Sequence, residues 1–266
     1  SYPSVNLGFV FTDAFEITNN ILSFGKVRLS YAEVGNDAGT YLTNSVFQQT
    51  NIGASFATIQ FPFNNGTVIV PGFSEGNTIG NPNLQPEITK AYEAGLDIRL
   101  FNGRVGIDAT YYNSTSESQI LNTSVAPSSG FTTQVVNIGK ISNKGVELQL
   151  NTTPLKIGAF RWDLSVNYTK NVNRVEELDP GNKELVLVAQ GLTPGLKLVV
   201  GKPYGVFEAT QALKTADGKV VVGPDGIPLD DPDPVEIGSI QPDWYGGATS
   251  TFSYKGLSLG ITMDTK

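Results

Sequence analysis

The sequence AYEAGLDIRLFNGRVGIDATYY, residues 91–112, decides the fold. It consists of two segments in which apolar residues occupy every second position, joined by Asn102-Gly103. A period of two over such a length is typical of β-strands, because successive side chains of a strand point to opposite faces. Asn-Gly between two such runs favours a type I′ turn, which needs positive φ at both central residues. The stretch therefore predicts a long antiparallel hairpin with one apolar and one polar face.

The composition excludes several classes of function. The chain of 266 residues has no Cys and no His, and 18 Lys+Arg stand against 25 Asp+Glu. Without thiols or imidazoles there is no Cys nucleophile, no His-based dyad or triad and no common zinc site. The net charge of -7 leaves no basic footprint for a nucleic acid. We therefore expect no enzyme, no cofactor and no nucleic-acid partner.

The same alternation recurs along the chain and predicts eight strands. The connections between them alternate between short and long, and the long ones cover residues 33–86, 113–137 and 171–243. In an antiparallel meander this order brings all the long loops to one end, as in bacterial outer-membrane β-barrels. Aromatic residues near both ends of the strands are typical of the two interfacial girdles of such barrels.

A second interpretation of the alternation is a soluble or surface-exposed β-sandwich that buries its apolar face and binds glycans. Three long loops at one edge favour the membrane barrel, and so does a polar face with both signs of charge, since a wet lumen accepts charge. Asp97 and Asp108 could be the paired carboxylates of a glycosidase, but in a barrel we expect them to belong to an ion network in the lumen. The residues predicted to face the lumen are Glu93, Asp97, Arg99, Arg104, Asp108, Glu147, Arg161 and Asp163.

Several phrases of the chain resemble the C-terminal half of SusC/RagA-type TonB-dependent outer-membrane transporters of the Bacteroidetes. The first is GNPNLQPE at residues 80–87, which leads into YEAGLD at 92–97. Others are NKGVEL at 143–148, WDLSVN at 162–167 and PDWYGG at 242–247. They occur in the order expected for the family and extend over nearly the whole chain.

The resemblance implies part of a 22-stranded barrel whose N-terminal plug and closing strands lie outside these 266 residues. We expect residues 1–266 to supply about eight strands of that barrel, with the remaining strands in the parent polypeptide. The resemblance also implies a bilayer around the barrel in the bacterial outer membrane, energy from TonB and a SusD-like lipoprotein over the external loops. The cargo it implies is an oligomeric nutrient, a glycan in preference to a peptide.

Aromatic residues around the last long loop are candidates for substrate contact, because sugar faces stack on aromatic rings. They are Tyr204, Phe207, Trp244 and Tyr245, and each could equally anchor a loop or contact the lipoprotein. The acidic run from Asp230 to Asp233 offers oxygen ligands of the kind that calcium prefers. It lacks the spacing of an EF-hand loop, so we favour a solvated loop stiffened by its prolines.

Overall fold

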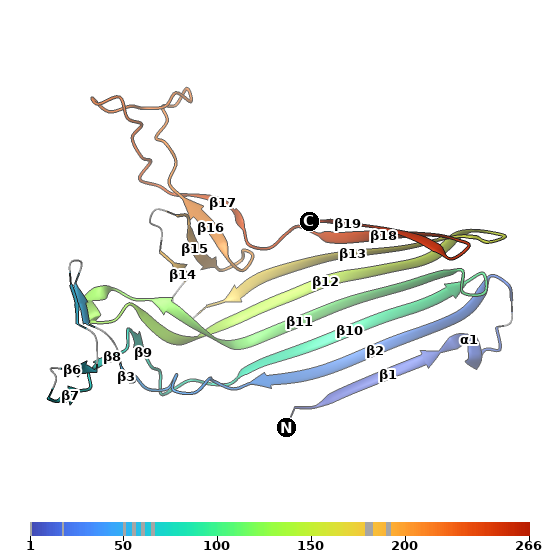
Figure 1. Ribbon diagram of the computed structural model, residues 1–266, viewed down its shortest axis with the longest axis horizontal. Helices are drawn as coiled ribbons and strands as arrows, with labels where there is room; N and C mark the ends of the chain where they lie inside the picture. Colours follow the sequence, from blue (N-terminus) through green and yellow to red (C-terminus); the bar gives the residue numbers. More distant parts are fainter. Residues whose placement is uncertain are drawn as a thin grey trace.

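The computed structural model describes residues 2–17, 19–49, 52–54, 57–59, 62–64, 67–178, 183–189 and 193–266. One large antiparallel sheet dominates the structure, and its strands follow one another in chain order (Figure 1). They are β1 (Ser4–Val10), β2 (Leu22–Asn36), β10 (Glu87–Leu100), β11 (Val105–Ser124), β12 (Thr133–Ile157), β13 (Phe160–Glu177), β18 (Tyr245–Tyr254) and β19 (Leu257–Thr265). The short β9 (Thr78–Ile79) pairs in parallel with the start of β12. The predicted meander of eight strands is confirmed.

The hairpin at residues 91–112 forms as its sequence predicts. Leu100 of β10 pairs with Val105 of β11, and the register then continues without a break as far as Ile88. Asn102 and Gly103 have φ values of 56° and 81°, and Phe101 before them has a φ of 54°, so the left-handed segment begins one residue earlier than predicted. Asn102 and Gly103 therefore lie in the left-handed region that an Asn-Gly turn requires.

The interval 113–137, expected to be a loop, is mostly strand. β11 continues to Ser124 and β12 begins at Thr133, which leaves a connection of residues 125–132 with one 3-10 turn, η1 (Pro127–Ser129). The expectation was wrong because residues 113–118 are polar on both faces, so no alternation marks the strand there. Ser118 and Gly139 then lie across from each other, outside the paired register. Ser118 has a φ of 56°, and a Cβ on Gly139 would lie 2.7 Å from the carbonyl oxygen of Glu177.

The other two long connections carry strands of their own. In the first, β3 (Phe47–Gln49) pairs with β8 (Phe73–Glu75), β4 (Ile52–Ala54) with β5 (Ala57–Ile59), and β6 (Phe63–Asn64) with β7 (Ile69–Val70). The sequence also predicts an extended piece near residues 56–61, which lies partly outside the described residues. The second contains a sheet of four strands, the loop sheet, made of β14 (Glu184–Val188), β15 (Gly195–Val199), β16 (Val206–Ala209) and β17 (Val235–Ser239).

Both of these connections begin later than the sequence predicts, because the preceding strands are longer. β2 continues to Asn36, beyond the expected loop start at residue 33, and β13 continues to Glu177, beyond the expected start at 171. The strand extensions carry mainly polar residues on both faces, so they lack the alternation on which the prediction relied.

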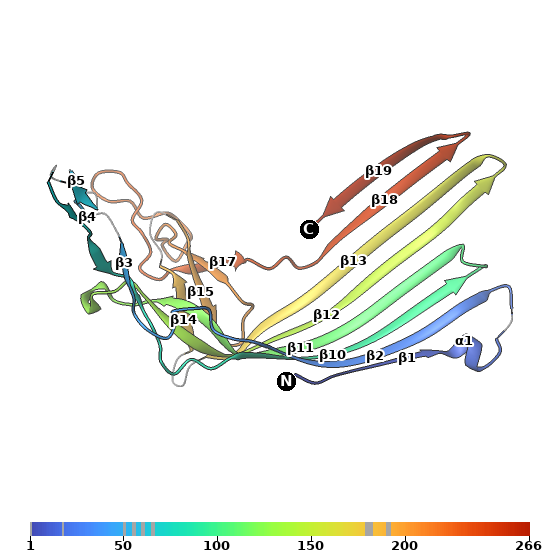
Figure 2. The same ribbon diagram turned by 60° about the horizontal axis from the view of Figure 1, so that its bottom comes forward.

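One face of the large sheet is apolar and uncovered. The sheet bends from β1 toward β19 as a single layer (Figure 2). Large apolar side chains on this face remain exposed, among them Leu7 at 62%, Tyr92 at 57% and Leu148 at 43%. Among the described residues no second layer packs over them, so the alternative of a soluble sandwich is wrong.

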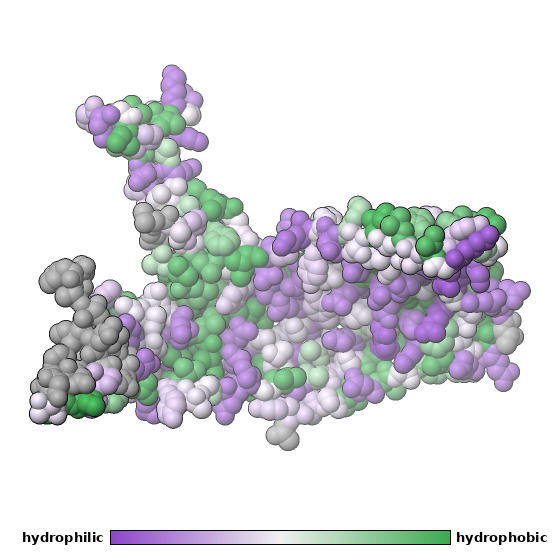
Figure 3. All heavy atoms as spheres, viewed as in Figure 1, coloured by the Kyte–Doolittle hydropathy of each residue, from purple (hydrophilic) through white to green (hydrophobic). Residues whose placement is uncertain are grey.

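The buried core lies at the loop end of the sheet. It consists of Ile138, Ile141, Val175, Leu178 and Leu198, each at most 8% exposed. Ile141 pairs with Val175 across β12 and β13, and Leu198 is the contribution of the loop sheet. In Figure 3 hydrophobic colour gathers in this region beside β14 and β15, whereas the visible face of the middle strands is mostly polar. Within the described residues, no helix has the length and hydropathy needed to span a membrane.

Candidate functional site

The residues predicted to face the lumen share the polar face of the sheet. Asp97 pairs with Asp108, and Glu147 stands opposite Thr110, two residues further along β11. At the short-turn end, Arg104, Arg161 and Asp163 border one hollow of about 350 Å³. The side chain of Arg161 donates to Asp163 at 2.6 Å, whereas that of Arg104 donates to the carbonyl of Thr153 at 2.9 Å.

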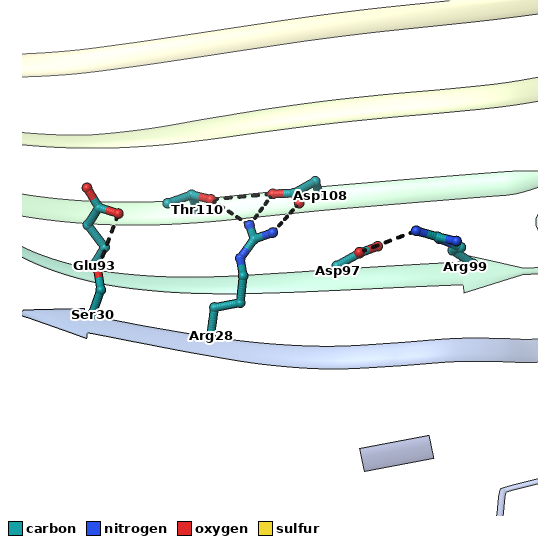
Figure 4. A network of polar contacts seen from close by, with 7 residues as sticks. All are labelled: Arg28, Ser30, Glu93, Asp97, Arg99, Asp108 and Thr110. Carbon is teal, nitrogen blue, oxygen red and sulfur yellow. Dashed lines mark hydrogen bonds and ion pairs between the residues drawn. The ribbon is translucent and has the colours of Figure 1, made fainter. Parts of the chain in front are cut away.

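An ion network occupies the middle of the polar face (Figure 4). The guanidinium of Arg28 binds both oxygens of Asp108, with Nη1–Oδ2 at 2.8 Å and Nη2–Oδ1 at 2.7 Å. Around this pair, Asp97 lies 3.9 Å from Arg99, and Ser30 donates to Glu93 at 3.4 Å. Arg28 is the charged member outside the predicted set of lumen-facing residues, although the alternation of β2 places it on the polar face.

The carboxylates and cations here are about 20–60% exposed, so water screens them and the network is worth little as a stabilising device. Its two bonds fix the Arg28 guanidinium in one plane above Gly95, where an added Cβ would come within 2.8 Å of Nε. The result is a charged floor that borders a hollow of about 340 Å³ lined by β1, β2, β10 and Thr110 of β11.

Closer to the loops, the polar face changes from charged to aromatic and amide groups. Tyr112 donates its hydroxyl to Asn171 at 3.0 Å. Asn171 and Asn173 both donate to Asn143, at 3.2 Å and 2.8 Å. These four residues form what we call the amide wall. Gly145 lies beneath the phenol of Tyr112, and a Cβ there would lie 2.3 Å from its oxygen.

The four aromatic candidates for substrate contact do not gather at one place. Tyr245 pairs with Thr169 on the polar face, is 46% exposed and borders a cavity of about 700 Å³ with Asn167 and Asp264. Trp244 lies on the other side, with its ring 5.8 Å from that of Tyr168 in the apolar face. The sequence could have separated these two, since Trp244 and Tyr245 fall in opposite phases of the alternation that runs through β18.

The remaining two candidates belong to the loop sheet. Tyr204 packs against the buried core, its backbone N–H donates to Asn173 at 2.7 Å, and burial raises the pKa of its phenol. Phe207 lies in β16 opposite Leu196. Tyr204 thus links the loop sheet to the amide wall, in the manner of a loop anchor.

Polar groups of the loop connection pair with one another. Lys197 donates to Glu208 at 2.6 Å and to Glu184 at 3.3 Å, and these hydrogen bonds raise the pKa of its ammonium group. In the acidic run, Asp231 accepts from the backbone N–H of Asp233 at 3.1 Å. In the described part of the chain, no three carboxylates lie close enough together to hold a metal ion.

Comparison with known proteins agrees with this architecture. Residues 1–254 match the family model of the TonB dependent receptor-like β-barrel. TonB-dependent receptor P26 of Formosa agariphila is 30% identical over 98% of this chain, and TonB-dependent receptor SusC of Bacteroides thetaiotaomicron is 32% identical over 72% of it. The chain spans 27% of the length of the first relative and 18% of that of the second.

A solved structure of the RagAB peptide transporter superposes on 99% of the chain with a TM-score of 0.76. The sequences are 24% identical, and the match covers 29% of that transporter chain, so this likeness speaks for the fold alone. The family model, however, covers seven of the eight strands of the meander, all except β19. The chain therefore belongs to the TonB-dependent receptor family and forms part of its outer-membrane β-barrel.

Proposed function

We propose that the parent protein imports an oligomeric nutrient across the outer membrane with energy from TonB. A SusD-like lipoprotein covers its long loops, and a glycan is favoured over a peptide as the cargo. The support comes from the SusC-like relative and from the strong difference between the two faces of the sheet. In this proposal the apolar face meets lipid, and the polar face with its ion network lines the lumen.

The observation that carries the proposal is the amide wall beside Tyr245. Tyr245 shares one row of the polar face with Glu147, through Thr169, and the row of Tyr112 and Asn171 lies two residues closer to the loops. Aromatic rings next to amides and a carboxylate suit sugars, because the rings stack on the apolar faces of a sugar while the polar groups bind its hydroxyls. This part of the polar face lies next to the loops, where a cargo would first arrive from outside.

A peptide remains the second candidate cargo. The fold is like that of the RagAB peptide transporter, and the asparagines of the amide wall could bind a peptide backbone as well as a hydroxyl. A peptide would gain little from Tyr245 unless it carried apolar or cationic side chains.

The test compares binding of both cargo classes to the full-length receptor, purified with its lipoprotein, by isothermal titration calorimetry. Oligosaccharides from starch, levan and agar form one set, and a tryptic digest of casein forms the other. Tyr245→Ala should weaken binding of the preferred oligosaccharide at least about tenfold, a typical loss for an aromatic contact at a binding centre. Trp244→Ala is the matched control and should leave it unchanged. Binding of the casein peptides but of no oligosaccharide would show that the cargo is a peptide and not a glycan.

A further inference from the structure

Three cations that belong to no ion pair lie on the apolar face where its aromatic belt ends. In the register of β12 and β13, Lys144 pairs with Val172, Val146 with Lys170, and Ser142 with Arg174. All three cations stand in the phase of the apolar side chains, because the next pair down on this face is Leu148 with Tyr168. Lys144 also shares its row with Tyr92, through Asn113 of β11.

These three cations lack carboxylate partners. Lys144, Lys170 and Arg174 are exposed, and none has a carboxylate within ion-pair distance among the described residues. Of the acidic groups near the cluster, Glu117 pairs with Lys90 and Lys140, at 3.9 Å and 3.6 Å, and Glu176 accepts from Ser142 at 2.6 Å. A hydrogen bond from a hydroxyl leaves the charge of Glu176 in place, and Glu177 stands opposite Lys140. The three cations of the cluster are therefore unpaired, and the carboxylates around them compensate their charge only in part.

The geometry of the three cations suits one anionic group of moderate size. Lys144 is the diagonal neighbour of both Lys170 and Arg174, so each diagonal separation is about 7–8 Å between Cα atoms. In the structure the guanidinium of Arg174 lies beside Gly201, where an added Cβ would be 3.5 Å from Nη2. A turn of this side chain toward Lys144 would bring it within reach of an anion that both lysines contact. A phosphate is the group that several cations bind together most readily, by charge-assisted hydrogen bonds.

An apolar groove lies directly beside this cluster. It has a volume of about 430 Å³ and is lined mainly by aromatic and aliphatic side chains, including Tyr31, Tyr92 and Tyr111. Tyr111 stands in one row with Val146 and Lys170, two strands away from the latter, or about 10 Å. A molecule with a phosphate head and acyl chains could therefore contact the cations and the groove at once.

We infer that Lys144, Lys170 and Arg174 form a binding site for the phosphorylated headgroup of a lipid in the outer leaflet, with an acyl chain in the groove of Tyr31, Tyr92 and Tyr111. This inference rests on the orientation in the proposed function, in which the apolar face meets lipid and the long loops face outward. The lipid would hold the barrel at a fixed depth without taking part in transport.

The test measures binding of diphosphoryl lipid A to the full-length receptor in dodecyl maltoside micelles, by native mass spectrometry and by displacement of a fluorescent lipid A. The variant K144Q/K170Q/R174Q should bind roughly a hundredfold more weakly, since each cation near an anionic lipid surface contributes about fivefold. Each single Gln variant should lose about fivefold, which keeps the test valid if the triple variant assembles poorly. The control K214Q/K219Q/K255Q makes the same change in net charge away from this face and should bind as the unaltered receptor does.

Two results would overturn the inference. One is equal binding by the receptor and by all the Gln variants of the cluster; the other is equally tight binding of lipid A from which both phosphates have been removed. Raising the salt from 50 to 500 mM should weaken binding to the receptor more than binding to the triple variant, because screening acts on the charges that were removed. Oligosaccharide binding, measured on the same variants, should not change. If every Gln variant of the cluster lost both oligosaccharide binding and lipid binding, the result would contradict the proposed orientation, in which the cluster faces lipid and the cargo site faces the lumen.

Discussion

A charge placed on the apolar face at mid-depth is the most direct test of which face meets lipid. Leu150 of β12 pairs with Ile107 on one side and Val166 on the other, so an arginine there would have only apolar neighbours. Leu150 is six residues from Lys144 and five from Leu155, which pairs with Trp162. With a rise of about 3.3 Å per residue and a tilt near 40°, it lies about 15 Å below the first and 13 Å above the second. The distance between the levels of Lys144 and Leu155 is therefore close to the height of the apolar band of such barrels, which is about 25 Å.

Leu150→Arg should therefore destabilise the assembled barrel by about 2–4 kcal/mol, the cost of an arginine near the bilayer midplane. At about 1.4 kcal/mol per decade, this corresponds to roughly a 30- to 700-fold smaller folding equilibrium constant. The matched control is Gln149→Arg, one residue away on the polar face. Gln149 lies between Asp108 and Asn167, so the added cation has an acidic neighbour and, in our proposal, water.

The assay is the heat-modifiable band of the full-length receptor in outer-membrane fractions, followed by urea unfolding of the purified protein in lipid bilayers. We expect a smaller folded fraction and a lower urea midpoint for Leu150→Arg, and values within about 0.5 kcal/mol of the unaltered protein for Gln149→Arg. Equal loss in both variants, or no loss in the first, would refute the assignment of the two faces.

Three further results are expected. Gly145→Ala should weaken oligosaccharide binding and lower stability by about 1–3 kcal/mol, because the new Cβ would meet Tyr112 and the backbone of β13, as calorimetry and urea unfolding can check; a neutral effect would contradict the close contact. A double-mutant cycle of Arg28→Met and Asp108→Asn should give a coupling of at most about 1 kcal/mol that shrinks in high salt. The stabilisation that Lys197 gives the loop sheet is present below its unfolded pKa, near 10.5, and is lost as pH rises through its raised folded pKa. Amide exchange, corrected for intrinsic rates, should therefore accelerate in β15 above that pH, and Lys197→Met should remove this dependence.

The sheet could be predicted from the sequence wherever one face is apolar and the other is not. In the hairpin of β10 and β11, alternation and Asn102-Gly103 agree, so the pairing, the place of the turn and the facing of residues 91–112 all follow. Beyond Tyr112 both faces carry polar residues, and backbone hydrogen bonds alone continue the ladder. Such bonds leave no mark on the pattern of side chains, which is why the end of β11 reads as a loop.

The alternation in the sequence also indicates the face of the sheet for site residues that the prediction missed or grouped together. Tyr112 falls in the polar phase of β11, next to Tyr111 in the apolar phase, and the structure separates the two rings accordingly. The amide wall could not be predicted from the alternation. Asn143 lies on β12 while Asn171 and Asn173 lie on β13, and only the register between these strands brings them together.

The break in the register at Ser118 and Gly139, which we call the kink, has a consequence for how such receptors diversify. Below it, the strict alternation of apolar and polar residues commits each side chain of β11 and β12 to one face; above it, Ile138 packs in a separate core with Leu198 of the loop sheet. An insertion or deletion of one residue above the kink would move side chains to the opposite face of the sheet only in the segment above the kink. The outer part can therefore be rewritten in sequence, or exchanged between relatives, while the membrane-level frame stays the same.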